Sequence, residues 1–290
     1  MQELTGRTAV VTGAASGMGL AFSRRFAAAG MNVVMADIEE PPLHAAADAL
    51  RTTGAAVQAT RVDASSAADN QRLLEETIER FGAANVVCLN AGVAKFGPLA
   101  EQTPQDWEWC LGVNLLGVGY GVSAFLPHLL EHDDGHVVIT ASVAGHTAAP
   151  RLGIYNASKH GAAAIAETLH GELLAEGSSI GVTCLCPGII NTNILESERN
   201  RPETLTAPGV PAEPDPEQLE RQAILTEVFN DGMPPEQVAD LVHDAVLSGQ
   251  FWLFTDHDFD APIAQRHRHI QERTNPVNAT PLVDPLGDGA

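Results

Sequence analysis

The stretch Thr8-Ala-Val-Val-Thr12-Gly13-Ala-Ala-Ser16-Gly17-Met18-Gly19 decides the fold. Its apolar first part predicts a buried strand, and residues 18–29 predict a helix. The glycines between them allow a tight turn and let backbone N–H groups approach a pyrophosphate at the helix N-terminus. A glycine-rich turn alone is weak evidence, but a position between a strand and a helix is the context that this motif requires. The stretch therefore predicts a dinucleotide-binding βαβ unit.

Strand-like and helix-like segments alternate from this turn to about residue 190. Near-continuously apolar strands indicate a parallel sheet covered on both faces, and right-handed crossovers give the doubly wound architecture. We predict an α/β fold: one Rossmann-type domain over residues 1–262, with a seven-stranded parallel sheet and helices on both faces. The expected strands are 8–12, 32–36, 56–62, 85–89, 135–141, 180–186 and 251–254. A long helix is expected over 104–130, bent near Gly117 and Gly119.

The pattern loosens after Pro187-Gly188, where the chain becomes acidic and rich in proline. A loop of this length in a compact domain is usually a lid or disordered. We interpret residues from about 189 to 235 as a substrate lid that contains one helix, over 217–229. Residues 263–290 predict an extended C-terminal tail, because prolines are frequent there and large apolar side chains are few.

Composition limits the partners and the compartment. The chain has 290 residues, 44% of them hydrophobic, and a net charge of −21, which should repel nucleic acid and anionic membranes. No apolar run approaches the roughly 20 residues of a membrane span, and the N-terminus does not resemble a secretory signal. Four scattered cysteines suggest buried thiols in a reducing compartment. We expect a cytoplasmic protein without nucleic-acid or membrane partners.

The ends of the second and third strands carry carboxylates. Asp37 lies 18 residues beyond Gly19, where a carboxylate can accept hydrogen bonds from ribose hydroxyls and would repel a 2′-phosphate. Ile38, Glu39 and Glu40 follow, so no basic residue offsets that repulsion, and NAD is favoured over NADP. Asp37 can also cap the next helix. Asp63 is placed to meet the adenine, and a purely capping role for it is equally open.

A second stretch, Tyr155-Asn-Ala-Ser-Lys159, carries groups that can move a proton. Residues four apart on a helix share one face, and an ammonium beside a tyrosine favours the phenolate and lowers its pKa. Ser142 stands at the end of the fifth expected strand, in reach of the same ligand. The spacing alone also fits an ordinary helix surface. His146 is an alternative second acid/base.

Together these motifs resemble those of the short-chain dehydrogenase/reductase family, over roughly residues 5–255. The glycine spacing is that of the family's NAD-preferring branch, and Leu89 is the one departure, replacing the first asparagine of Asn-Asn-Ala-Gly. The matching residues are Gly13, Gly17, Gly19, Asn90-Ala91-Gly92, Asn114, Ser142, Tyr155, Lys159, Pro187-Gly188 and Thr192.

The resemblance implies roles. Tyr155 would be the general acid/base, and Lys159 would lower its pKa and hold the nicotinamide ribose. Ser142 would orient the substrate oxygen, and Asn114 would fix a helix bend and support a water path. Direct hydride transfer needs no metal. The residues implied in cofactor binding are Gly13, Ser16, Gly17, Met18, Gly19, Asp37, Asp63, Asn90, Ala91, Gly92, Tyr155, Lys159, Pro187, Gly188, Ile190 and Thr192.

The expected function is that of an NAD-dependent oxidoreductase that interconverts a secondary alcohol and a ketone. The apolar beginning of the lid, Ile189, Ile190, Ile194 and Leu195, suggests an apolar substrate, up to the bulk of an aryl, terpenoid or steroid-like alcohol. Relatives are homotetramers or homodimers. A catalytically idle NAD-sensing protein on the same fold is the alternative, and an epimerase or dehydratase would need another glycine spacing.

Overall fold

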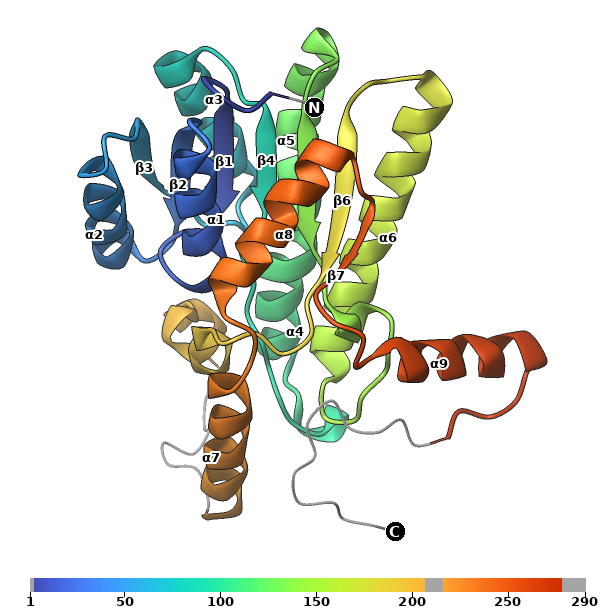
Figure 1. The fold of residues 1–290 in the computed structure, drawn as a ribbon. Coiled ribbons are helices and arrows are strands. Elements are labelled where there is room, and N and C mark those ends of the chain that lie inside the picture. The colour runs from blue at the N-terminus through green and yellow to red at the C-terminus, as the bar shows by residue number, and fades with distance from the viewer. Residues whose placement is uncertain (1–2, 207–215, 278–290) are drawn as a thin grey trace.

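The computed structural model describes residues 3–206 and 216–277. Its core is a seven-stranded parallel sheet in the order β3-β2-β1-β4-β5-β6-β7, which confirms the predicted Rossmann-type α/β fold (Figure 1). The order reverses between β1 and β4, and this switch point opens a crevice at the carboxyl ends of the strands. The strands are β1 Thr8–Thr12, β2 Asn32–Asp37, β3 Val57–Arg61, β4 Val86–Leu89, β5 His136–Thr140, β6 Gly181–Cys186 and β7 Trp252–Phe254.

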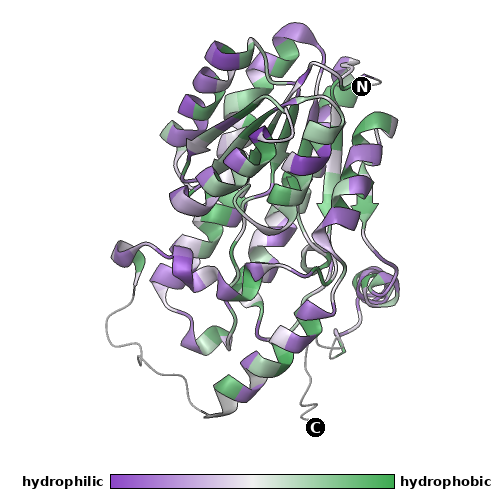
Figure 2. Ribbon diagram, turned by 60° about the vertical axis from the view of Figure 1, so that its left-hand side comes forward, coloured by the Kyte–Doolittle hydropathy of each residue, from purple (hydrophilic) through white to green (hydrophobic). Residues whose placement is uncertain are grey.

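Helices cover both faces of the sheet (Figure 1). Phe22 and Phe26 on one side, and Phe125 and Leu129 on the other, are fully buried between sheet and helix. Figure 2 shows apolar residues concentrated in the strands and hydrophilic residues on the outward helix surfaces. One face carries α1 Gly17–Ala28, α2 Glu40–Arg51 and α8 Pro235–Ser248, and the other carries α3 Ala67–Phe81, α5 Gly117–His132 and α6 Gly153–Glu176.

The expected long helix is divided by a π-helical turn. Helix α4, Pro104–Leu111, passes into this turn at Gly112–Leu116 and continues as α5. The irregularity therefore adjoins Gly117, near where the bend was predicted, and it contains the buried side chain of Asn114, whose contacts are described below. Short 3-10 turns lie at Leu99–Glu101 (η1) and Val143–Gly145 (η3).

Among the described helices, the continuous one over Pro104–His132 is long and apolar enough to cross a membrane. This corrects the expectation that no apolar stretch approaches that length. Half of its most apolar window is buried inside the fold, where α5 packs against α3 and the sheet. Packing within the domain therefore accounts for its apolar side chains.

The lid is partly helical. It contains the 3-10 segments η4 Asn193–Asn200 and η5 Glu203–Leu205 and the helix α7 Pro216–Asn230, close to the predicted 217–229. In Figure 1, α7 extends below the body of the domain. Residues 207–215 of the predicted lid lie outside the described residues.

The expected extended tail is wrong in its first part, because Asp260–Glu272 forms helix α9. Pro262 lies in the first turn, where the missing N–H has no helical partner to lose, so the helix tolerates it. None of its residues is buried, and it projects from the domain in Figure 1. Low apolar content therefore did not prevent a helix here. The last part of the predicted tail, 278–290, lies outside the described residues.

Candidate active site

One cavity lies along the carboxyl ends of the strands. Seventeen of the eighteen predicted site residues line its wall, and the remaining one, Asn114, lies behind it. The wall residues are Gly13, Ser16, Gly17, Met18, Gly19, Asp37, Asp63, Asn90, Ala91, Gly92, Ser142, Tyr155, Lys159, Pro187, Gly188, Ile190 and Thr192. Residues up to 179 positions apart in sequence are thus brought to one surface by the parallel order of the strands.

The glycine turn has a backbone that only glycine fits. Gly13 and Gly17 have φ angles of +68° and +52°, in the left-handed region. A Cβ on Gly19 would lie 2.1 Å from the carbonyl oxygen of Gly13. The first-turn N–H groups of α1 have no helical partners, and they point a partial positive charge at the cavity. The turn is therefore a cradle of the kind that a pyrophosphate fills, and a side chain at Gly19 would block it.

Asp37 is held in the cavity wall by backbone donors. Its two carboxylate oxygens accept hydrogen bonds from Ala15 N–H at 2.9 Å and Glu39 N–H at 3.0 Å. Burial raises the pKa of Asp37 above its usual range, and these backbone hydrogen bonds oppose the rise. The N-cap position of α2 is Glu39, so Asp37 is not the N-cap residue. Its position fits the predicted ribose contact.

Asp63 lines the cavity but does not cap the following helix, so the purely capping alternative is wrong and the adenine contact stays a prediction. Its Oδ1 accepts hydrogen bonds from the N–H of Ser65 at 2.9 Å and from its hydroxyl at 2.6 Å, which forms a side-chain turn before α3. Ser66, not Asp63, caps that helix by accepting from Asp69 N–H. Asp63 also lines the cavity. The turn thus orients a carboxylate that stays available at the adenine end.

Asn90 ties three strands together at the switch point. Its Nδ2 donates to Thr12 O at 3.0 Å, at the end of β1, and its Oδ1 accepts from the Thr140 hydroxyl at 3.2 Å, at the end of β5. The N–H groups of Asn90 and Ala91 both donate to the Thr12 hydroxyl. The Asn-Ala-Gly segment therefore fixes the floor of the cavity.

Asn114 acts from behind the wall. It is completely buried, and its side-chain amide bonds the backbone of Val93 twice, accepting from N–H and donating to O, each at 2.8 Å. Nδ2 also donates to the Ser158 hydroxyl at 3.1 Å. These bonds hold the π-helical turn against β4 and α6. Asn114 therefore positions the catalytic helix, and its predicted water path stays a prediction.

Ser142, Tyr155 and Lys159 meet at the other end of the cavity. The Ser142 hydroxyl accepts from Ala144 N–H at 3.1 Å and donates to Pro187 O at 3.4 Å. Lys159 Nζ donates to Thr140 O at 2.8 Å and lies 5.7 Å from the centroid of the Tyr155 ring. The end of β5 and one turn of α6 thus present a hydroxyl, a phenol and an amine to the same space.

The expected lowering of the Tyr155 pKa by Lys159 is not found. Burial raises the pKa of Tyr155 to about 12, although its hydrogen bond with Ser142 acts to lower it. Burial also lowers the pKa of Lys159 to about 8. Desolvation disfavours both charged forms, and it outweighs the attraction between them. Tyr155 is therefore a neutral phenol at neutral pH, ready to donate a proton.

The segment after β6 closes the nicotinamide end. Gly188 N–H donates to the Thr255 hydroxyl at 3.0 Å, and a Cβ on Gly188 would lie 2.3 Å from Asp256 Oδ2. Thr192 is the N-cap residue of η4, but its side chain makes no capping hydrogen bond. Its methyl group instead lies against the glycine turn, 3.1 Å from the position of a Cβ on Gly17.

The substrate side of the cavity is largely apolar, and several of its residues were not predicted. Ile189, Ile190 and Ile194 line it as expected, whereas Leu195 does not. The unpredicted members come from loops and from α4, η4 and α7, and no local motif marks them. They include Phe96, Trp109, Leu152 and Phe229, with Glu39, Arg199 and Asn200 at the adenosine end.

Two histidine groups lie away from the cavity wall. His146 contacts Cys186 Sγ through Nε2 at 3.3 Å and packs against Trp252 and Phe254, and burial lowers its pKa to about 4. A partly buried, neutral imidazole that lies outside the cavity wall does not fit a second acid/base.

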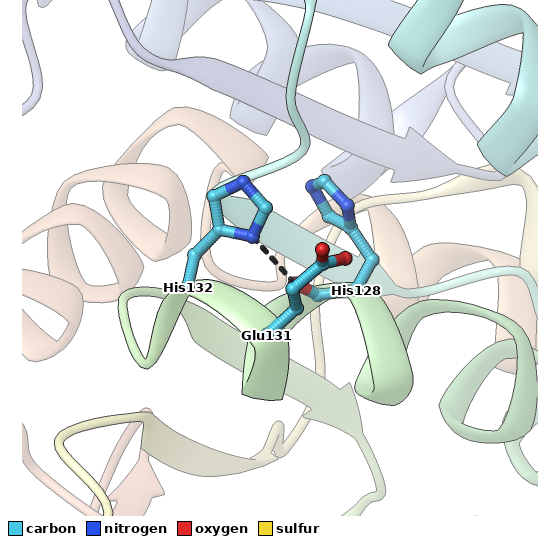
Figure 3. Close-up of side chains that lie close together, drawn as sticks. All are labelled: His128, Glu131 and His132. Carbon is cyan, nitrogen blue, oxygen red and sulfur yellow. Dashed lines mark hydrogen bonds between the residues drawn. The ribbon is translucent and has the colours of Figure 1, made fainter.

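The other group, His128, Glu131 and His132, has ligand atoms within 4.8 Å of one another on α5 (Figure 3). Ala84 N–H donates to His128 Nε2 at 3.2 Å. A neutral imidazole has one free lone pair, and this bond occupies it. His128 is thus committed to the protein backbone and is not available to a metal while that bond holds.

The comparisons with known proteins agree with this geometry. The short chain dehydrogenase family model matches residues 7–203. A short-chain dehydrogenase/reductase from Burkholderia phymatum, solved in complex with NAD, is 38% identical, with a TM-score of 0.91 and 99% of both chains covered. The 1-deoxy-11-beta-hydroxypentalenate dehydrogenase of Streptomyces arenae is 36% identical over 90% of this chain and 85% of its own. The C alpha-dehydrogenase of a Sphingobium strain is 28% identical over 97% and 90%.

Proposed function

Because the chain belongs to the short-chain dehydrogenase/reductase family, we propose that it interconverts a secondary alcohol and a ketone with NAD as the hydride carrier. The observation that carries this proposal is the meeting of Ser142, Tyr155 and Lys159 in the cavity that also contains the glycine turn and Asp37. An idle NAD sensor would need the glycine turn and Asp37 to bind the cofactor, but it would not need Ser142, Tyr155 and Lys159 together. The complete proton-handling set therefore favours an enzyme, in the class of alcohol dehydrogenases and ketone reductases.

Bound NAD would accept a hydride from the alcohol carbon or, in the reduced form, deliver one to the ketone. Tyr155 exchanges the proton of the substrate oxygen, and Ser142 hydrogen-bonds the same oxygen and orients it. The Lys159 ammonium, tied to Thr140 O, adds positive charge beside the phenol and is placed to hold a ribose hydroxyl. No step in this scheme uses a metal.

NAD is the proposed cofactor on the charge at the adenosine end of the cavity. Asp37 lies in that part of the wall, and its carboxylate would repel a 2′-phosphate. The relative from Burkholderia phymatum was solved with NAD. Glu40 is also negatively charged, but it does not line the cavity wall.

The proposed substrate is apolar, with room for a bulky alcohol. Phe96, Leu152 and Phe229 face the cavity from three separate elements and add to the apolar isoleucines after β6. Ser197 and Asn193 give the wall a few polar groups for orientation. The name of the Streptomyces arenae relative specifies 1-deoxy-11-beta-hydroxypentalenate, which motivates a test of hydroxylated hydrocarbon substrates.

We also propose a cytoplasmic homo-oligomer, a tetramer or a dimer, that contacts neither nucleic acid nor membranes. The net charge of −21 supports the proposed lack of contact with nucleic acid and anionic membranes, because it would repel both. Leu116 in the π-helical turn, Leu130 on α5 and Leu174 on α6 are exposed, and these are the helices on which relatives associate. Light scattering after size-exclusion chromatography would test the oligomer, and a monomer would contradict it.

Activity with a panel of secondary alcohols tests the function. We expect the absorbance of reduced nicotinamide to appear with NAD, and kcat/KM to be higher for bulky apolar alcohols than for small polyols. A clear preference for NADP would contradict the proposed cofactor. Activity restricted to small polar polyols would contradict the substrate class, and binding of NAD without turnover of any alcohol or ketone would favour the idle sensor.

A further inference from the structure

An ion pair joins the end of β2 to the lid. Arg199, in η4, donates through Nε and Nη2 to the two carboxylate oxygens of Glu39, at 3.1 and 3.0 Å. Its Nη1 donates to the backbone oxygens of Asn193 and Glu196, and Asn200 Nδ2 donates to the Glu39 carboxylate at 3.3 Å. A two-bond pair of this kind fixes the guanidinium in orientation as well as in position.

This pair lies at the adenosine end of the cavity. Glu39 N–H donates to Asp37 Oδ1 at 3.0 Å, and the negative charge of the Glu39 side chain lies close enough to act on the Asp37 carboxyl, raising its pKa in addition to the larger effect of burial. Both line the wall, as do Arg199 and Asn200. Among the described residues of that wall, the cationic ones are Arg199 and Lys159, and Lys159 stands at the catalytic end. Arg199 is thus the cation nearest to the site that a 2′-phosphate would need.

We propose that Glu39 determines cofactor specificity through Arg199, by occupying a guanidinium that would otherwise bind the 2′-phosphate of NADP. This inference rests on the NAD preference proposed above. A free arginine binds phosphate through two parallel hydrogen bonds, and it is the usual means by which this fold accommodates a 2′-phosphate. Asp37 repels the phosphate directly, whereas Glu39 removes the group that would attract it.

The inference also gives the lid a role in the choice of cofactor. Arg199 lies 160 residues from Glu39 in sequence and belongs to the segment that begins at the nicotinamide end with Thr192. The Arg199 and Glu39 side chains are 33% and 23% exposed, so solvent partly screens them. We therefore expect a change in affinity of about tenfold rather than a complete reversal of preference.

Equilibrium binding tests the proposal without reference to turnover. Titration calorimetry would give the Kd of NAD and of NADP for the wild type, Glu39→Gln, Arg199→Gln and the double variant. We expect Glu39→Gln to lower the ratio of the NADP Kd to the NAD Kd by about tenfold relative to the wild type. The same substitution made in the Arg199→Gln variant should change that ratio by less than about twofold. Glu40→Gln is the matched control, since it removes the same charge one residue away, outside the cavity wall.

The outcomes separate the two proposals. An equal fall of the ratio with and without Arg199 would mean that Glu39 acts by its charge alone, and no fall would remove its role altogether. Either result overturns this inference and leaves the NAD preference standing. A wild-type ratio near one would overturn the NAD preference and this inference with it. A fall for Glu40→Gln as large as for Glu39→Gln would also contradict a specific role for Glu39.

Discussion

The two sides of the cavity are built differently. On the side of the sheet, Asn90 and Asn114 bond backbone groups of neighbouring elements and are almost completely buried. On the side of the lid, η4 and the residue after it are attached by side chains: Ser197 accepts from Ala94 N–H, Arg199 pairs with Glu39, and Arg201 pairs with Asp106. The first side is held by asparagine amides that bond backbone groups at the carboxyl ends of the strands, and the second by side chains that the lid itself contributes.

This difference assigns the reaction to one side of the cavity and the choice of substrate and cofactor to the other. The proton-handling residues stand on the anchored side, where a change should alter the rate or the fold. The lid contributes residues that face the substrate and the adenosine end, where a change should alter affinity and leave the reaction intact. Substitutions on the anchored side, each compared with a control substitution elsewhere, can test whether the two sides of the cavity differ in this way.

The largest effect is expected on the anchored side, from Tyr155→Phe. Removing the hydroxyl removes the general acid/base, so kcat should fall by about 10² to 10⁴-fold while NAD still binds with a similar Kd. Tyr120→Phe, at the chain's other tyrosine, is the control, because Tyr120 lies outside the cavity wall. Near-normal turnover of Tyr155→Phe would show that the proposed mechanism is wrong.

Asn114→Ala should have the next largest effect, on stability. The substitution leaves the buried N–H and carbonyl of Val93 without their partner, which costs about 2 to 3 kcal/mol in the free energy of unfolding. Asn191→Ala in the lid removes an exposed bond to Asn230 O and should cost less than about 1 kcal/mol. Denaturant titration measures both. Equal losses would contradict the division between the two sides.

The pH dependence should also come from the anchored side. Because burial raises the pKa of Tyr155 to about 12, the phenolate needed for alcohol oxidation becomes more populated as pH rises. The kcat/KM for oxidation should therefore increase by up to about tenfold per pH unit between about pH 6 and pH 7, where Lys159, with a pKa of about 8, is still mostly protonated. Ketone reduction uses the phenol and should not increase. A flat oxidation profile would argue against Tyr155 as the base.

The smallest effect is expected from the lid anchor. Asp106 is buried, and although burial acts to raise its pKa, hydrogen bonds from Thr103 and Arg201 hold the pKa below its usual range. Asp106→Asn weakens the 2.7 Å pair with Arg201, so KM for the alcohol should rise about three- to tenfold with little change in kcat. Asp240→Asn removes a carboxylate that pairs with Arg25 on the surface and serves as the control. A fall in kcat with unchanged KM would contradict the assignment.

The sequence predicted the anchored side better than the lid for a physical reason. Buried parallel strands and the glycine turn leave local patterns, such as apolar runs and glycines with positive φ, that can be read without a structure. The pair of Glu39 and Arg199 joins residues 160 positions apart and leaves no local pattern. Helix α9 was missed because its residues bury nothing, so no apolar periodicity marks it.

The Asn114 region was predicted only in part. The sequence indicated a bend near the observed π-helical turn, but the contacts of Asn114 with Val93, after β4, and with Ser158, in α6, need the structure. The pKa of Tyr155 was misjudged in a similar way. The spacing of Tyr155 and Lys159 indicates the attraction between them, whereas the burial that opposes it depends on the whole fold.

The π-helical turn has a geometric consequence for the helix that contains it. A π-helical turn holds about one residue more than an α-helical turn, and each residue advances an α-helix by about 100°, so the faces before and after the turn point in different directions. Before the turn, Trp109 and Cys110 pack into a small cluster beside the cavity, and after it Phe125 and Leu129 pack into the main core. One extra residue thus lets a single helix serve two hydrophobic clusters that an unbroken apolar stripe could not reach together.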